Sequence, residues 1–256
     1  MAEGWQGWDD YAPFYDWENA QTQARRDVAF WQRLAAAHPG VVLELGCGTG
    51  RISIPVLKAG ARLVGVDRSA PMLQRAYRRI ARAHLEDRAL LVRGDIRSLP
   101  FRRRRPFALV MAPYGILQSL TREADLGATL ASVARVLERG GLFGIDLVPD
   151  LPRWSEYSRH KSLSGKGPAG TTLTLVESVR QDRRRHLTIF DQEYTVRRRR
   201  ARRVHCFSLT FRTLSVAQMA ERLEAAGFRI DAVLGDYSGG PWDERADVWV
   251  IMARRK

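Results

Sequence analysis

Short apolar runs alternate with amphipathic segments along the first 150 residues of the chain. Five runs are apolar at almost every position and rich in Val, Leu and Ile, and they lie at 41–45, 62–66, 89–93, 107–112 and 141–147. Strands that are apolar on both faces are typical of a parallel sheet covered by helices on both sides. The five runs therefore predict buried parallel strands.

Segments with helical spacing precede the first of these runs and separate later ones. The first follows a polar, aromatic lead-in and ends at Pro39 and Gly40, the second is capped by Ser69 and runs to about residue 83, and the third lies within 121–139 and ends at Gly140-Gly141. The apolar faces of the first and third are formed by Phe30, Trp31 and Leu34, and by Leu126, Leu130, Val133 and Leu137. Strands that alternate with helices predict βαβ units and an α/β fold.

The pattern changes after residue 150. Stretches 171–180, 186–196 and 204–214 have no helical period and predict three antiparallel strands, whereas 151–170, with several Pro, Gly and Ser, predicts a loop. A last helix begins with a capping box of Ser215 and Gln218 and ends at Gly227. Two further strands, at 228–235 and 246–254, complete the pattern.

Composition narrows the class of protein. The chain has 256 residues, 45% of them hydrophobic, which is enough for one large core, and no apolar run approaches the length of about 18 residues that a membrane helix needs. The N-terminal residues are acidic and aromatic, unlike a targeting peptide. Neither Cys47 nor Cys206 has a metal-binding neighbourhood. We therefore expect a cytoplasmic protein without a metal.

The formal net charge of +14 comes mainly from arginine, because only four of the 42 basic residues are Lys. Such a bias is typical of GC-rich genomes. Arginine is nevertheless concentrated at 102–105, 183–185 and 197–203. These runs are either solvated loops and strand ends or a surface for an anionic partner such as nucleic acid.

The first strand ends in a glycine loop, "VVLELGCGTGR" at 41–51. Glycines at 46, 48 and 50 let the backbone approach a ligand closely. Asp67 ends the next strand, where a carboxylate can bind the two hydroxyls of a ribose. Arg51 stands where a dinucleotide fingerprint needs glycine, and Glu44 suits a ligand with a cationic, amine-bearing chain rather than a pyrophosphate.

Five segments resemble successive motifs of the class I S-adenosylmethionine-dependent methyltransferases. They are "VLELGCGTGR", "VGVDRS", "VRGDIRSLPF", "FALVMAPYGILQSL" and "VARVLERGGLFGIDL". The resemblance implies a Rossmann-like seven-stranded sheet whose last strand is antiparallel, with S-adenosylmethionine as cofactor. It also implies a role for each cofactor-binding residue. The methionine and ribose part would be surrounded by Glu44, Gly46, Cys47, Gly48 and Gly50, and the ribose hydroxyls would be held by Asp67. The adenine would be contacted by Arg68, Met72, Asp95 and Ile96, and the side of the methyl group would be lined by Ala112, Tyr114 and Leu117.

The stretch before the last helix resembles the extra sheet of small-molecule N-methyltransferases, such as those that dimethylate amino sugars or methylate glycine. "YAPFYD" resembles their N-terminal segment, so Tyr11 and Tyr15 are candidate contacts to the carboxylate of the cofactor. The resemblance implies four parts. These are an N-terminal lid and helix at 1–40, a cofactor-binding core at 41–150, an antiparallel insert on the acceptor side at 151–213, and a closing helix with two strands at 214–256.

Several of these residues also have a purely structural interpretation. Asp67 could cap the helix that follows, Asp95 could be a turn residue, and Cys47 is better explained as a small filler than as a nucleophile. Tyr114, after Pro113, could line the pocket or stack on a flipped base, although Ala112 stands where base-flipping enzymes carry Asp or Asn.

We expect in-line methyl transfer to a small molecule, with an amine or a hydroxyl as acceptor. The candidates for accepting a proton are Tyr15, Tyr114, Asp146, Tyr194 and Tyr237. A second hypothesis is a nucleic-acid-directed modifier or binder, such as a methyltransferase that acts on RNA or another polyanionic partner through the arginine runs. A third is a non-catalytic protein that binds the cofactor. The sequence leaves open the acceptor, the methylated atom (N, O or C) and the oligomeric state.

Overall fold

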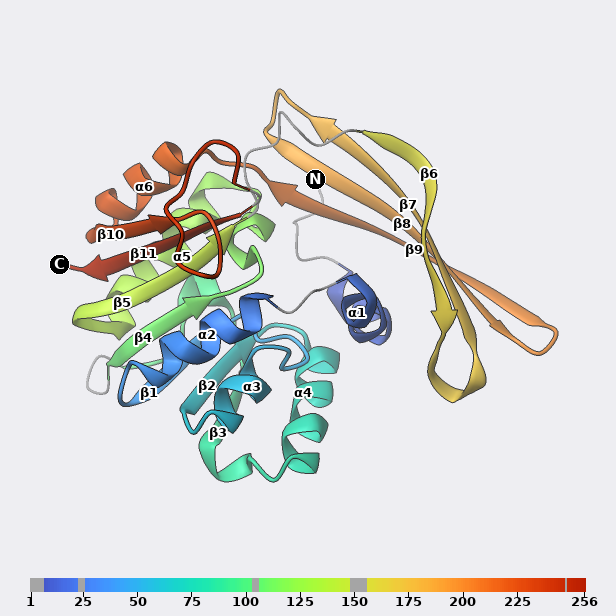
Figure 1. Cartoon of the computed structure of the whole chain (residues 1–256), viewed down its shortest axis with the longest axis horizontal. Helices are drawn as coiled ribbons and strands as arrows, with labels where there is room; N and C mark the ends of the chain where they lie inside the picture. Colours follow the sequence, from blue (N-terminus) through green and yellow to red (C-terminus); the bar gives the residue numbers. More distant parts are fainter. Residues whose placement is uncertain (1–6, 23–25, 103–105, 148–155, 247) are drawn as a thin grey trace.

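The computed structural model describes residues 7–22, 26–102, 106–147, 156–246 and 248–256. An α/β core lies beside a separate antiparallel sheet, with one helix between them (Figure 1). The core sheet has the order β10-β11-β5-β4-β1-β2-β3. Its strands are β1 (Val41–Leu45), β2 (Arg62–Asp67), β3 (Ala89–Arg93), β4 (Phe107–Ala112), β5 (Leu137–Leu147), β10 (Phe228–Leu234) and β11 (Trp249–Arg255).

The predicted topology is confirmed. Strands β1 to β5 pair in parallel, while β11 is antiparallel to both β5 and β10. Alternate residues of β1 and β4 enter two different cores: Val42 and Leu109 pack on one face of the sheet, Leu43 and Val110 on the other. Both faces are therefore covered, as runs without alternation predict.

Helices α2 (Arg26–Ala36), α3 (Ser53–Lys58) and α4 (Ala70–Arg82) contribute to one core, and α5 (Glu123–Val136) and α6 (Val216–Ala225) to the other. The Ser69 hydroxyl caps α4 by accepting a hydrogen bond from the Met72 amide at 3.3 Å. The capping box of Ser215 and Gln218 is present at the start of α6. Within the described ranges, no helix is long and apolar enough to cross a bilayer.

The predicted boundary between the third helix and the fifth strand was wrong. Helix α5 ends at Val136, and Leu137, which is fully buried, has an extended conformation and pairs with Phe107 of β4. Gly140 and Gly141 lie inside β5 instead of ending the helix. The β4–β5 register shifts at this point, and Gly140 has φ +75°, so the glycines accommodate an irregularity of the strand.

The insert forms a sheet of four strands, in the order β6-β7-β8-β9, where three were predicted. These are β6 (Tyr157–Lys166), β7 (Thr172–Asp182), β8 (Leu187–Arg198) and β9 (Ala201–Arg212). The prediction of a loop over 151–170 was wrong for β6, which lies at the edge and is exposed along most of its length. Such a strand has no buried face and therefore no apolar alternation. Residues 151–155 lie outside the described ranges.

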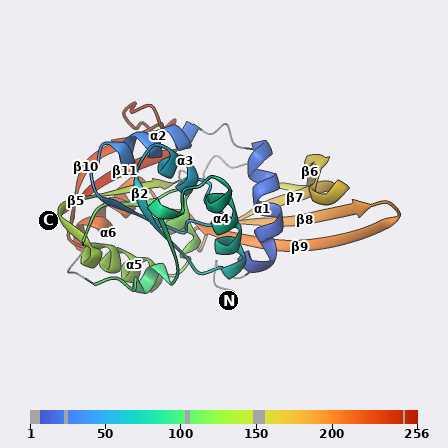
Figure 2. The ribbon, with the colours of Figure 1, turned by 90° about the horizontal axis from the view of Figure 1, so that it is seen from below.

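The lead-in also contains a helix that the sequence analysis missed, α1 (Trp8–Thr22). Figure 2 shows it between α4 and the insert. Tyr11 and Phe14 of α1 pack with Leu175, Tyr194 and Leu209 of the insert in a third hydrophobic cluster. Its aromatic side chains are thus explained by a contact with residues more than 150 positions away.

Candidate functional site

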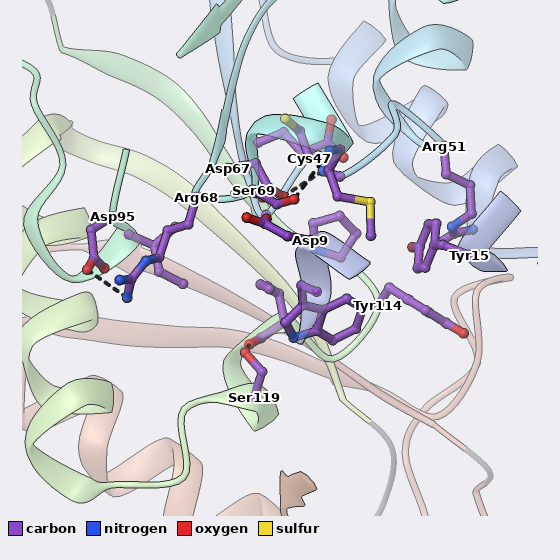
Figure 3. Close-up of a pocket in the computed structure, with 18 of the residues that line it drawn as sticks. Asp9, Tyr15, Cys47, Arg51, Asp67, Arg68, Ser69, Asp95, Tyr114 and Ser119 are labelled. Carbon is purple, nitrogen blue, oxygen red and sulfur yellow. Dashed lines mark hydrogen bonds and ion pairs between the residues drawn. The ribbon is translucent and has the colours of Figure 1, made fainter. Parts of the chain in front are cut away.

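A cavity of about 490 Å³ opens at the carboxyl ends of β1, β2 and β4. Helix α1, the glycine loop, the turn after β4 and Phe211 of the insert form its walls (Figure 3). This edge is where ligands bind in open parallel sheets, and the volume lies within the range of small-molecule sites. The cavity is therefore the candidate functional site.

The glycine loop follows β1 with left-handed backbone at Gly46 (φ +60°) and Gly48 (φ +53°). A Cβ on Gly46 would lie 2.5 Å from Ile116 Cδ1, so only glycine fits there. Gly50 instead packs toward Ile54 and Ala76 and does not line the cavity. The loop thus exposes the backbone of residues 46–48 to a ligand.

Asp67 lies across this loop. Its carboxylate accepts hydrogen bonds from the amide of Gly48 at 2.8 Å and from the amide of Ser69 at 2.8 Å. Burial raises the pKa of Asp67, and these two amide hydrogen bonds oppose that shift. One bond to each oxygen leaves further lone pairs, which can accept from two hydroxyl groups. Because Ser69 caps α4, the capping role offered for Asp67 is not needed.

Glu44 is the second-last residue of β1 and lines the cavity with only 2% of its surface exposed. Its carboxyl accepts a hydrogen bond from Ser53 Oγ at 2.6 Å. Burial raises the pKa of Glu44 to about 8, so the free carboxyl is largely protonated at neutral pH. A ligand cation beside it would favour ionisation. The site can therefore bind a cation at this point.

Arg51 is a cavity residue that the sequence analysis did not select. Its Nη2 lies 2.7 Å from Asp27 Oδ2 of α2, and its guanidinium carbon lies 4.7 Å from the ring centre of Tyr114. Burial alone would lower the pKa of Arg51, but the hydrogen bond to Asp27 raises it, so the group stays charged. A guanidinium here can bind a carboxylate, while Glu44 can bind an amine. The feature of the sequence that could have identified Arg51 as a site residue is its position directly after Gly50, the last glycine of the loop.

Asp95 lies at the other end of the cavity. It caps a short 3-10 helix, Ile96–Ser98, by accepting a hydrogen bond from the Arg97 amide at 2.9 Å. Arg68 Nη1 lies 3.2 Å and Arg97 Nη2 2.8 Å from its Oδ2 atom, and these neighbours lower its pKa against the effect of burial. The turn role considered for Asp95 is therefore present, and contact with adenine stays a prediction.

Tyr114 follows β4 in a strained turn. Tyr114 and Gly115 both have φ +61°, a conformation that a non-glycine residue rarely adopts. The Gly115 amide donates to Asp146 Oδ1 at 2.9 Å, and the Tyr237 hydroxyl donates to Asp146 Oδ2 at 2.9 Å. Burial raises the pKa of Asp146 to about 6. Asp146 thus holds the turn that places Tyr114 on the wall.

The structure brings most of the predicted site residues together. Those that line the cavity are Tyr15, Glu44, Gly46, Cys47, Gly48, Asp67, Arg68, Met72, Asp95, Ile96 and Tyr114. Those that do not are Tyr11, Gly50, Ala112 and Leu117. The Tyr11 hydroxyl instead donates to Glu18 beneath the insert, and Ala112 and Leu117 are buried in the core.

Of the five candidate proton acceptors, Tyr15 and Tyr114 line the cavity, whereas Asp146, Tyr194 and Tyr237 do not. Both oxygens of Asp146 are hydrogen-bonded, and Tyr194 donates to Glu18. Additional lining residues come from segments without a recognisable motif, namely Trp8, Asp9 and Asp10 of α1 and Phe211 of β9. Ser119 and Leu120, at the end of the fourth quoted motif, also line the cavity and were not selected.

Comparison with known proteins agrees with this geometry. Residues 42–141 match the protein family described as "Methyltransferase domain". Over 84% of its length the chain is 27% identical to the cypemycin N-terminal methyltransferase of a Streptomyces species, and the match covers 83% of that protein.

Two solved structures share the fold with its insert. The CcbJ methyltransferase from Streptomyces caelestis has a TM-score of 0.78 and 22% identity, covering 97% of both chains. An amino pentose methyltransferase from Micromonospora echinaspora, solved with S-adenosylmethionine bound, has a TM-score of 0.69 and 18% identity, covering 95% of this chain and 96% of that one. Residues 42–141 are thus a methyltransferase domain, and the whole chain shares the fold of S-adenosylmethionine-dependent methyltransferases.

Proposed function

We propose that the enzyme methylates an amine nitrogen of a small-molecule acceptor. The observation that carries this proposal is the composition of the cavity, whose lining combines carboxylates and glycine backbone with aromatic side chains. The aromatic residues Trp8, Tyr114 and Phe211 come from three different parts of the chain. Such walls favour amines carried on apolar or ring-shaped groups. The relatives named for an N-terminal amine and an amino pentose support the choice of an amine over a hydroxyl.

The cavity residues fit the cofactor in four places. In this proposal Asp67 accepts from the ribose hydroxyls, and Gly46 and Gly48 allow close approach of the backbone. Arg51 and Glu44 then bind the carboxylate and the ammonium of the amino-acid chain, respectively. The adenine lies near Ile96 and Met72, where its amine competes with Arg68 and Arg97 for Asp95. When bound, the cofactor supplies a methyl group on a sulfonium centre.

The chain contributes orientation, exclusion of water and a path for a proton. An attacking amine must be unprotonated and in line with the methyl group, and fixed geometry of this kind can lower a barrier by several kcal/mol. Burial raises the pKa of Tyr15, so its phenol stays neutral and serves to position the amine. Asp9 and Asp10 in the first turn of α1 also line the cavity, and their carboxylates can accept the proton.

Methyl transfer from isotope-labelled S-adenosylmethionine to a panel of acceptors tests this proposal. Each amine, such as an amino sugar or the N-terminus of a short peptide, is paired with the matching alcohol. We expect labelled product from at least one amine and none from its alcohol. Label on alcohols alone would contradict the amine assignment. Cofactor binding without turnover on any acceptor would favour a non-catalytic protein, and Asp67→Ala serves as the control for cofactor-dependent signal.

A further inference from the structure

The hairpin between β8 and β9 carries a dense group of arginines. We name it the arginine hairpin, and its residues are Arg197, Arg198, Arg199, Arg200, Arg202 and Arg203, all of them exposed. Figures 1 and 2 both show this end of the insert projecting beyond the rest of the molecule, away from the α/β core. Its residues do not line the cavity. The hairpin therefore presents charge that the methyl-transfer site does not use.

The arrangement of these arginines opposes local stability. Arg197 and Arg202 are directly paired across the two strands, and like charges in that position repel each other. Arg199 begins the two-residue turn between Arg198 and Ala201 with φ +53°, a conformation that favours glycine or asparagine. A sequence under no constraint would replace both features. Of the two, the pair of like charges, which costs stability, indicates a function for the charge itself.

Some arginines elsewhere in the same sheet have acidic partners, whereas among the residues that the structure describes no ion pair is formed by Arg183 or Arg184. Arg180 lies 2.9 Å from Asp191, and Arg185, in the turn between β7 and β8, lies 3.7 Å from Asp182. In the described part of the chain, no residue of the arginine hairpin forms an ion pair. A general bias toward arginine would affect the β7–β8 turn and the β8–β9 turn alike. It therefore does not explain why a carboxylate, Asp182, accompanies the first turn and none accompanies the second.

The spacing of the charges matches that of a nucleic-acid duplex. Along the hairpin, the Val196–Arg203 pair lies three residues before the turn at 199–200. At a rise of about 3.4 Å per residue, the six arginines are distributed over about 10 Å of strand length, or about one charge per 1.7 Å. A DNA duplex carries one phosphate charge per about 1.7 Å of its axis. A ribbon of two strands can also enter a major groove about 12 Å wide. The exposed hairpin has no aromatic side chain on which bases of a single strand could stack.

We propose that the arginine hairpin is a binding surface for the phosphate backbone of duplex DNA, independent of sequence and separate from the methyl-transfer site. Six contacts predict that affinity falls about 10³-fold between 50 and 200 mM salt. Binding of this kind would localise the enzyme without altering its chemistry. The inference does not depend on the identity of the acceptor.

Fluorescence anisotropy of the full chain with a labelled 20-base-pair duplex tests the proposal. The hairpin variant carries Arg197→Thr, Arg199→Gly and Arg202→Thr, and its matched control carries Arg183→Gln, Arg184→Gln and Arg185→Gln, which removes the same charge from the opposite turn. We expect the control to bind like the wild type. The hairpin variant should retain about three contacts, so that its affinity changes only about 40-fold over the same salt range.

Thermal unfolding provides a second measurement on the same proteins. Because Arg199→Gly and the Thr pair remove the two unfavourable features, the hairpin variant should have a higher Tm than the wild type. Equal losses of affinity in both triple variants, or none in either, would overturn the proposal. It would also be overturned if single-stranded DNA or polyglutamate at equal charge competed as well as the duplex.

Discussion

Binding of the cofactor should release a proton from Glu44. In the free enzyme, burial raises the pKa of this carboxyl to about 8, and Ser53 Oγ donates its hydrogen bond at 2.6 Å. Because this pKa lies about one unit above pH 7, about nine-tenths of the free enzyme molecules carry the proton on Glu44 at that pH. An ammonium group brought beside the carboxyl would favour its ionised form.

The size of this effect follows from the distance and the burial. A unit charge at about 4 Å, with an effective dielectric constant of about 20, contributes about 4 kcal/mol. That energy corresponds to a fall of about three units in the pKa, which leaves Glu44 ionised at pH 7. We therefore expect the release of about 0.8–0.9 proton for each cofactor bound. The ligand amine is itself mostly protonated at pH 7 and takes up only a small fraction of a proton.

Calorimetry at pH 7, in two buffers with different enthalpies of ionisation, measures the number of protons released. S-Adenosylhomocysteine is a suitable ligand because it has the amine-bearing chain and does not react. Adenosine lacks that chain and should release none. The Glu44→Gln substitution should also abolish proton release on binding of S-adenosylhomocysteine. The affinity of this variant for the ligand should not change as the pH passes through the pKa of Glu44, about 8. Equal proton release from wild type and Glu44→Gln would refute the placement of the amine beside this carboxyl.

Three further outcomes are expected. Asp67→Ala should weaken S-adenosylhomocysteine binding at least about 100-fold in calorimetry, because two hydrogen bonds to a charged acceptor are lost; Cys47→Ala, at a buried filler position, should weaken it far less. Asp146 has a folded pKa of about 6, above its unfolded value, so ionising it costs stability as pH rises from about 4 through 6. Urea unfolding of Asp146→Asn should thus show a smaller loss of stability between pH 4.5 and 7.5, by about 2 kcal/mol, than that of the wild type. Tyr114→Gly should relieve about 1 kcal/mol of backbone strain and raise the Tm while lowering kcat/KM; an unchanged rate would contradict a role for this ring.

The α/β core could be predicted because its signals are local. A strand buried on both faces must be apolar at consecutive positions, and a helix start such as Ser215 carries its own cap, so each element is encoded within a few residues. The same is true of the glycine loop and Asp67, which lie at the ends of adjacent strands. Helix α1 and strand β6 gave no such signal. The pattern of α1 depends on a distant sheet, and β6 has no buried face.

The same distinction between local and long-range signals applies to the residues of the site. Residues on the cofactor side follow strands of the core, so their position could be inferred from the sheet alone. Phe211, Trp8 and Asp9 reach the cavity because the insert and α1 fold over it, which no spacing in the sequence records. The misplacement of Tyr11 has this cause as well. Once the lead-in is a helix packed on the insert, Tyr11 turns toward Glu18, while Tyr15, one turn later, reaches the cavity.

Helix α1 connects the two sides of the cavity mechanically. Asp16 accepts a hydrogen bond from Thr49 Oγ1 of the glycine loop at 2.6 Å, so α1 is bound to the cofactor side. Two residues later, the half-buried carboxyl of Glu18 accepts from Tyr194 of the insert, with Gln192 Nε2 at 3.3 Å. The helix that supplies Asp9 and Tyr15 is therefore held by both the core and the antiparallel sheet of the insert. We therefore expect a displacement of the insert to shift the loop around Thr49 through these hydrogen bonds.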